Sequence, residues 1–112
     1  MMKYTTQQFK HCDLVKVSGR IDSLTVQELE TVFNDLLEAG RFNLVCDLSE
    51  VEFISSAGLR LLINVQKSCR KLDRGELVLA QVGERVFGAL DLAGFVPLFR
   101  MEHDVLQAVG SF

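Results

Sequence analysis

Apolar and polar residues alternate with a period of two in two short segments near the start of the chain. Residues 4–9 and 14–18 show this pattern, which is typical of strands with one face buried. A tight turn at 10–13 joins them and predicts an antiparallel hairpin, with the first segment at the edge of a sheet. Residues 19–23 break the alternation. A nearly continuous apolar run at 42–48 predicts a strand that is buried on both faces, as in parallel sheets.

Other segments have the three-to-four-residue apolar spacing of helices. In the first of them, Thr25 to Glu28 fits a capping box, Leu24 and Leu29 fit the hydrophobic staple around it, and Gly40 ends the helix. In the third, Val86, Phe87 and Leu90 are expected to face inward. The expected helices span residues 25–40, 56–72, 84–92 and 104–109. Further strands are expected at 76–81 and, after the only proline, beyond residues 95–100.

The resulting order of elements is β-β-α-β-α-β-α-β-α. Strands that alternate with helices predict an α/β fold with a mixed, mainly parallel sheet of about five strands, covered by about four helices. A chain of 112 residues is long enough for one core, so we expect a single domain over residues 1–112.

Composition narrows the class of function. The net charge of −3 argues against direct nucleic-acid binding, which needs clustered cations. The small basic cluster at Lys67, Arg70, Lys71 and Arg74 is interpreted as the solvated end of a helix, where cations complement the dipole. No apolar run is long enough for a membrane span and no secretory signal is evident, so we expect a cytoplasmic protein.

No motif indicates a metal, a cofactor or an enzyme. The three cysteines are widely spaced and are expected to be reduced and mostly buried. Neither the dinucleotide fingerprint nor the phosphate-binding loop is present. The two histidines, His11 and His103, are expected at the surface, so Ser56 has no evident general base. Asp47 ends an apolar strand as a phosphorylatable aspartate would, but the carboxylates that would hold Mg²⁺ are missing; we expect it to bond nearby backbone.

Two adjacent hydroxyls, Ser55 and Ser56, stand where the central strand passes into the second expected helix. The start of a helix has free backbone N–H groups and a partial positive charge. A serine there either caps the helix or carries a phosphate that those groups tolerate. The sequence alone leaves both interpretations open.

Four ordered segments resemble the STAS family, and more closely the bacterial anti-sigma factor antagonists. Residues 17–22, VSGRID, resemble the family's L-x-G-x-[LI]-D, and residues 45–54, VCDLSEVEFI, resemble its hhxDLsxVxfh. Residues 55–59, SSAGL, resemble D-S-[ST]-G-L, and residues 86–95 resemble the helix that ends in [ST]-G-[LF]. The resemblance covers nearly the whole chain.

The resemblance implies a regulator that is switched by phosphorylation and is not an enzyme. In that family the unmodified protein binds an anti-sigma factor that is also a serine kinase, which frees a sigma factor for transcription. Phosphorylation releases the partner, and a PP2C-type phosphatase restores the binding form. By this resemblance Ser56 is the phosphoacceptor, Asp22 is its neighbour, and Gly58 allows close approach of the partner. The implied partner-binding residues are Asp22, Ser23, Ser55, Ser56, Ala57, Gly58, Leu59 and Arg60.

One departure keeps alternatives open. Ser55 stands where the family has aspartate, so Ser55 is a second candidate for modification. Asp22 and Asp47 are candidates for the carboxylates that would repel the partner together with the phosphate. The alternative function is an unswitched STAS subunit of a larger assembly, such as a stressosome or a lipid-transport complex.

Overall fold

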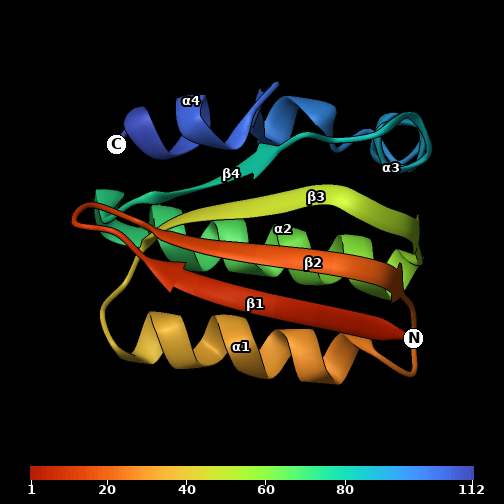
Figure 1. Ribbon diagram of the computed structural model, residues 1–112, viewed down its shortest axis with the longest axis horizontal. Helices are drawn as coiled ribbons and strands as arrows, with labels where there is room; N and C mark the ends of the chain where they lie inside the picture. Colours follow the sequence, from red (N-terminus) through yellow and green to blue (C-terminus); the bar gives the residue numbers. More distant parts are fainter.

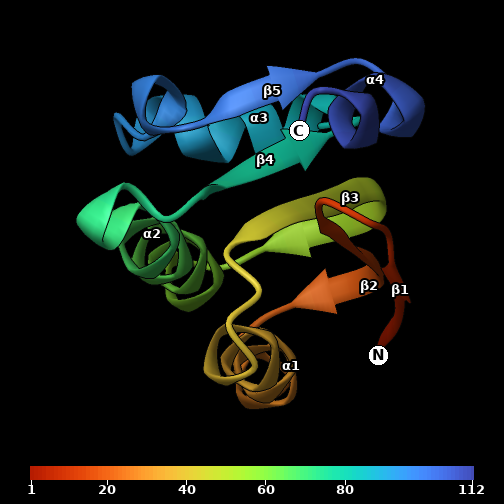
Figure 2. The ribbon, with the colours of Figure 1, turned by 90° about the vertical axis from the view of Figure 1, so that its left-hand side faces the viewer.

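The computed structural model describes all 112 residues and contains one five-stranded sheet in the order β1-β2-β3-β4-β5 (Figure 1; β5 is labelled in Figure 2). β1 pairs with β2 antiparallel, and the other neighbours are parallel. The strands are β1 (Met2–Gln8), β2 (Asp13–Ile21), β3 (Asn43–Ile54), β4 (Glu76–Ala80) and β5 (Arg100–Glu102). The helices are α1 (Val26–Glu38), α2 (Ser56–Arg70), α3 (Glu84–Leu92) and α4 (Val105–Gly110), with short 3₁₀ helices η1 (Lys71–Asp73) and η2 (Val96–Leu98). The predicted α/β order of elements is confirmed.

Alternate residues of the central strands face two separate cores. Leu44, Cys46 and Leu48 of β3 belong to a cluster of 21 buried residues under α1, α2 and α3. Val45 belongs to a smaller cluster of five that α4 covers. Successive side chains of a strand point to opposite faces, and Figure 2 shows α1 and α2 on one side of the sheet and α4 on the other. The expected burial of this strand on both faces is therefore confirmed.

Two strands are longer than the apolar pattern predicted. β2 runs through Ile21 and β3 runs to Ile54, where the sequence suggested a break at 19–23 and a strand end at Leu48. Beyond Asp47, β3 has passed the end of β4 and pairs only with β2, with irregularities in register. This extension is partly exposed and polar, so it lacks the apolar run that marks a buried strand.

Gly19 lies in this extended part of β2 with a φ of +92°. A Cβ atom there would stand 1.9 Å from the carbonyl oxygen of Met1. Glycine is therefore required for β1 to lie against β2 at this point, and its presence does not end the strand.

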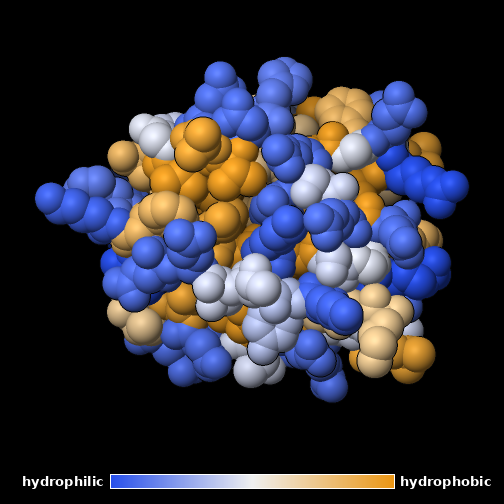
Figure 3. Space-filling model, viewed as in Figure 1, coloured by the Kyte–Doolittle hydropathy of each residue, from blue (hydrophilic) through white to orange (hydrophobic).

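Other boundaries and contacts also differ from the prediction. The predicted inward position of Phe87 is wrong, since 43% of its surface is exposed, whereas Val86 and Leu90 are buried as expected. Residues 96–98 form η2, whose first turn contains Pro97, and the last strand begins only at Arg100. α4 is short and leaves Leu106 exposed; on the face drawn in Figure 3, apolar surface gathers over this part of the molecule.

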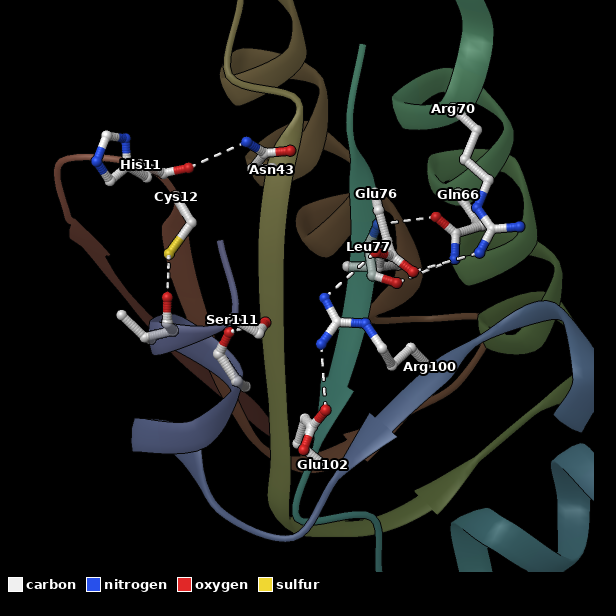
Figure 4. Close-up of polar contacts among 12 residues, drawn as sticks. His11, Cys12, Asn43, Gln66, Arg70, Glu76, Leu77, Arg100, Glu102 and Ser111 are labelled. Atoms are coloured by element: carbon white, nitrogen blue, oxygen red, sulfur yellow. Dashed lines mark hydrogen bonds and ion pairs between the residues drawn. The ribbon is translucent and has the colours of Figure 1, made fainter. Parts of the chain in front are cut away.

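A buried amide holds α2 to the sheet. The Gln66 Nε2 atom donates to the carbonyl oxygens of Leu77 (2.9 Å) and Leu98 (3.0 Å), and its Oε1 atom accepts from the Leu77 N–H (2.7 Å). β5 pairs with β4 only from Val78 onward, so the Gln66 side chain takes the place of a neighbouring strand at Leu77 (Figure 4).

Candidate functional site

The ends of β2 and β3 and the starts of α1 and α2 meet at one edge of the sheet, on the right in Figure 1. Ile21 is paired with Ile54, and the Ser55 N–H donates to the Ile21 carbonyl oxygen at 2.8 Å. This bond continues the ladder of the two parallel strands by one residue. It places the loop that contains Asp22 beside the first turn of α2.

The cap of α2 is Ser55, and Ser56 is the first helical residue. Ser55 has an extended backbone, and its Oγ atom accepts a hydrogen bond from the Gly58 N–H at 3.2 Å. Serine and aspartate cap helices about equally well, so Ser55 in place of the family's aspartate preserves the start of α2. The interpretation of Ser56 as the cap is wrong.

The two serines therefore differ in availability. Ser56 is exposed, whereas Ser55 is only partly exposed and its oxygen is used by the cap. Arg60, one turn further along α2, is exposed, and Ala57 is partly exposed. The outer side of the first turn thus presents a hydroxyl that the helix does not need, followed by a cation.

Gly58 and Leu59 point into the protein instead. A Cβ atom on Gly58 would lie 2.7 Å from Ile54 Cγ1 and 2.8 Å from Ile21 Cγ2, and Leu59 belongs to the core. The absence of a side chain at residue 58 allows α2 to pack on the ends of β2 and β3. Residue 58 is therefore a glycine because α2 packs closely on the sheet, and not because a partner approaches there as predicted. Leu59 is buried and has little surface for a partner to contact.

The Asp22 carboxylate is bound within its own loop. Its Oδ1 atom accepts from the backbone N–H groups of Leu24 (2.9 Å) and Thr25 (3.2 Å), and Arg20 lies 3.7 Å from Oδ2. The hydrogen bond from Leu24 is the main cause that lowers the pKa of Asp22 below its ordinary value, so a fixed negative charge lies next to the start of α2. Ser23, beside it, is exposed.

The predicted capping box and staple of α1 do not form. The Thr25 hydroxyl accepts from the Asp22 N–H and donates to the Arg20 carbonyl oxygen, so it points back into the loop. Leu24 is 90% exposed and does not contact a staple partner in the core. The loop before α1 is stabilised by Asp22, and Leu24 is left as an apolar side chain at this edge of the protein.

A cation–π contact that the sequence did not indicate borders the same edge. The guanidinium of Arg20 lies 4.4 Å from the centre of the Phe53 ring, and both residues are exposed. Residues 20 and 53 are paired in the β2–β3 register, but that pairing follows from the unpredicted extension of both strands. Only a prediction of the register would have found this contact.

Asp47 is not part of this edge. It is buried, and its Oδ1 atom accepts from the Ser49 N–H at 3.0 Å, the backbone bond expected for it. Ile54, at the edge, lies seven residues further along β3, or about 23 Å at roughly 3.3 Å per residue. The structure therefore rejects Asp47 as a carboxylate close to Ser56, whereas Asp22 remains at that position.

Thiol, imidazole and carboxylate groups show no arrangement for metal binding. No cluster of three or more such residues is present. All three cysteines are free and buried, and burial raises the pKa of the Cys46 thiol to about 12 and that of Cys69 to about 12. His11 and His103 are exposed. No helix has the length and apolar character that a membrane crossing requires.

Comparison with known proteins identifies the family of this chain. The sequence model of the STAS domain matches residues 3–108. The anti-sigma-B factor antagonist of Staphylococcus aureus is 31% identical over 97 residues, which are 87% of this chain and 88% of that protein. The chain belongs to the STAS domain family, among the anti-sigma factor antagonists.

Two further likenesses extend over nearly all of this chain. BtrV of Bordetella bronchiseptica, which is named as a candidate anti-sigma factor antagonist, is 29% identical over 111 residues, 99% of this chain and 95% of its own. The Bacillus cell fate determinant SpoIIAA, whose structure is known in the phosphorylated form, has a TM-score of 0.78 and 13% identity. That match covers 97% of this chain and 98% of the other, and it concerns the fold alone.

Proposed function

We propose that the unmodified protein binds an anti-sigma factor that is also a serine kinase, and that phosphorylation of Ser56 ends this binding. Binding would free a sigma factor, and a PP2C-type phosphatase would restore the binding form. These events would take place in the cytoplasm, where bacterial transcription occurs. The proposal rests on the structural difference between the two serines: Ser55 caps α2, whereas Ser56 is exposed and makes no capping bond.

The start of α2 suits such a switch because it tolerates a phosphate. A phosphoserine adds about −1.5 to −2 charges at neutral pH, and the partial positive charge of a helix start favours an anion. The fold therefore does not need to change on modification. The protein similar in fold, SpoIIAA, is known in a phosphorylated form.

The partner would be released by repulsion and bulk at its contact surface. The ionised Asp22 lies beside the start of α2, so the phosphate would raise the negative charge of a surface that already has one. A loss of about 3 kcal/mol in binding free energy would lower affinity roughly 150-fold. The proposed contact surface comprises the exposed side chains of Ser23, Ser56 and Arg60 and the partly exposed Asp22 and Ala57.

The test incubates the protein with a candidate anti-sigma factor kinase and ATP and measures the intact mass of the protein. We expect the addition of one phosphate to the wild type and to Ser55→Ala, and none to Ser56→Ala. A modified Ser56→Ala would show that Ser55 or another residue is the acceptor. Binding of the anti-sigma factor with no added phosphate would instead favour the unswitched STAS subunit of a larger assembly.

A binding assay tests the charge mechanism separately. Ser56→Asp should weaken binding of the anti-sigma factor, whereas Ser56→Ala should bind about as well as the wild type. The thermal midpoints of both variants should stay within a few degrees of the wild type, because the capping bond is made by Ser55. Equal binding by Ser56→Asp and the wild type would contradict release by negative charge.

A further inference from the structure

The second half of α2 borders a preformed groove of about 390 Å³ between this helix and η2. Ile63 and Leu98 provide its apolar floor, and Leu98 is 42% exposed. Lys67, Arg70 and Lys71 stand along its rim. A small apolar surface bordered by cations is therefore open to solvent on the helix that also carries Ser56.

Gln66 fixes the two walls of the groove relative to each other. Its amide nitrogen donates to the Leu98 carbonyl oxygen of η2 and to the Leu77 carbonyl oxygen of β4, at 3.0 and 2.9 Å. Figure 4 shows its side chain directed from α2 toward Leu77. A buried amide that is bonded at both ends keeps η2 in place, so the groove does not have to form when a ligand arrives.

The charge of this region is opposite to that of the protein as a whole. None of the ion pairs in the structure includes Lys67 or Lys71. Arg70 is half exposed and lies 3.3 Å from Glu76, which also pairs with Arg100 (Figure 4).

Arg70 also borders a second, polar cavity of about 520 Å³. Together the two cavities are lined by five basic and two acidic side chains, whereas the whole chain has a net charge of −3. The basic side chains are Lys67, Arg70, Lys71, Arg74 and Arg100, and the acidic ones are Asp73 and Glu76.

We propose that this groove binds an acidic segment of a partner protein, which seats an apolar side chain on Ile63 and Leu98. The carboxylates of the segment would pair with Lys67, Arg70 and Lys71. The dipole of α2 favours cations at its end, but it gives no reason for an open apolar floor between them. A nucleic acid fits less well, because the groove has no aromatic side chain on which a base could stack.

This surface is separate from the proposed switch. At about 1.5 Å per residue, Lys67 lies roughly 16 Å along the helix axis from Ser56. A partner in the groove would therefore be held whether or not Ser56 is modified. The inference extends the proposed function and does not depend on it.

The probe for a test is a short fluorescein-labelled helical peptide, with Glu residues on both sides of two Leu residues one turn apart. Fluorescence anisotropy would measure its affinity at low and at physiological salt. We expect Lys67→Glu/Lys71→Glu to weaken binding at least about tenfold. The matched control is Lys10→Glu/Arg85→Glu, which changes the net charge equally at two exposed residues elsewhere; it should bind within about twofold of the wild type.

Further variants distinguish binding in the groove from non-specific charge attraction and from binding at the start of α2. Leu98→Ser keeps every charge and should still weaken binding, as should a peptide with Ser in place of Leu. Ser56→Asp should leave peptide binding unchanged even if it abolishes binding of the anti-sigma factor. Thermal unfolding of each variant would show whether it is folded. If Lys67→Glu/Lys71→Glu does not fold, the binding measured for Leu98→Ser tests the inference instead.

Three results would overturn the inference. One is equal loss of binding in the control variant, and another is unchanged binding by Leu98→Ser. The third is displacement of the peptide by a DNA duplex or by phosphatidylglycerol vesicles at lower concentrations than by unlabelled peptide. That result would assign the basic side chains to a nucleic acid or a membrane surface.

Discussion

The two ends of α2 are built in different ways. At its start, Gly58 lies directly on Ile54 and Ile21, and a single polar bond from Ser55 caps the helix. At its end, Val65 and Cys69 also pack in the core. The amide of Gln66 adds hydrogen bonds to β4 and η2, and Arg70 forms one ion pair with Glu76 of β4. Both ends have apolar packing, and the second end adds several polar contacts to it.

This difference indicates where the surface charge can change without effect on the fold. At the start of α2 the exposed hydroxyl of Ser56 takes no part in the packing below it, so the proposed phosphate would act on a partner and not on the fold. At the end of α2 the rim cation Arg70 is also bonded to Glu76. A change of charge at Arg70 would therefore also remove a contact within the fold, so this end of α2 is less suited to a switch.

The largest effect should come from Gln66→Leu at the polar end. This change leaves the buried N–H and C=O of Leu77 and the C=O of Leu98 without their partner. Unfolding free energy should fall by about 3 kcal/mol or more, because each unpaired buried group costs about 1–3 kcal/mol. Urea unfolding would measure it, with the exposed Asn64→Leu on the same helix as the control, expected within about 0.5 kcal/mol. Similar values for the two variants would mean that polar bonds do not hold this end.

The next effect concerns the packed start of α2. Gly58→Ala should lower the unfolding free energy by roughly 1–3 kcal/mol, because the new methyl group would lie within 3 Å of Ile54 and Ile21. The same change at Gly88 of α3, where no atom lies within 4 Å of the new Cβ, should raise it by roughly 0.5–1 kcal/mol through helix propensity. Thermal unfolding of both variants would compare them. An equal rise at Gly58 would show that the packing there is loose.

The sequence predicted the parts of the molecule that rest on periodic apolar burial. It identified the order of the elements, the central position of residues 42–48 and the helix that begins at Ser56. It did not predict the polar extension of β3, because pairing with β2 and not a buried face stabilises it. Apolar spacing does not specify hydrogen-bond geometry or strand register. It therefore could not show that Ser55 is the cap, that the Thr25 hydroxyl bonds within its own loop, or that Asp47 lies far from the site.

The titration of Cys69 tests whether water is excluded from the buried side of α2 near its end. Burial raises the pKa of the Cys69 thiol from 9.0 to about 12, although nearby Arg74 opposes this. The folded state therefore keeps a proton that the unfolded chain releases, and this stabilisation is complete below pH 9 and is lost as pH rises toward about 12. Above pH 9, Cys69 should lower the unfolding free energy by about 1.4 kcal/mol per pH unit. Urea unfolding of wild type and Cys69→Ala at several pH values would give this difference in slope; equal slopes would indicate a hydrated thiol.

The smallest effect separates the two serines at the start of α2. Ser55→Ala removes the acceptor for the Gly58 N–H and should lower the unfolding free energy by about 1 kcal/mol. Ser56→Ala removes an exposed hydroxyl from the first helical position and should change it by less than about 0.5 kcal/mol. Thermal unfolding, with both variants unphosphorylated, measures the pair. If Ser56→Ala were the more destabilising of the two, Ser56 would be part of the structure, and a hydroxyl with that role is poorly suited to repeated modification.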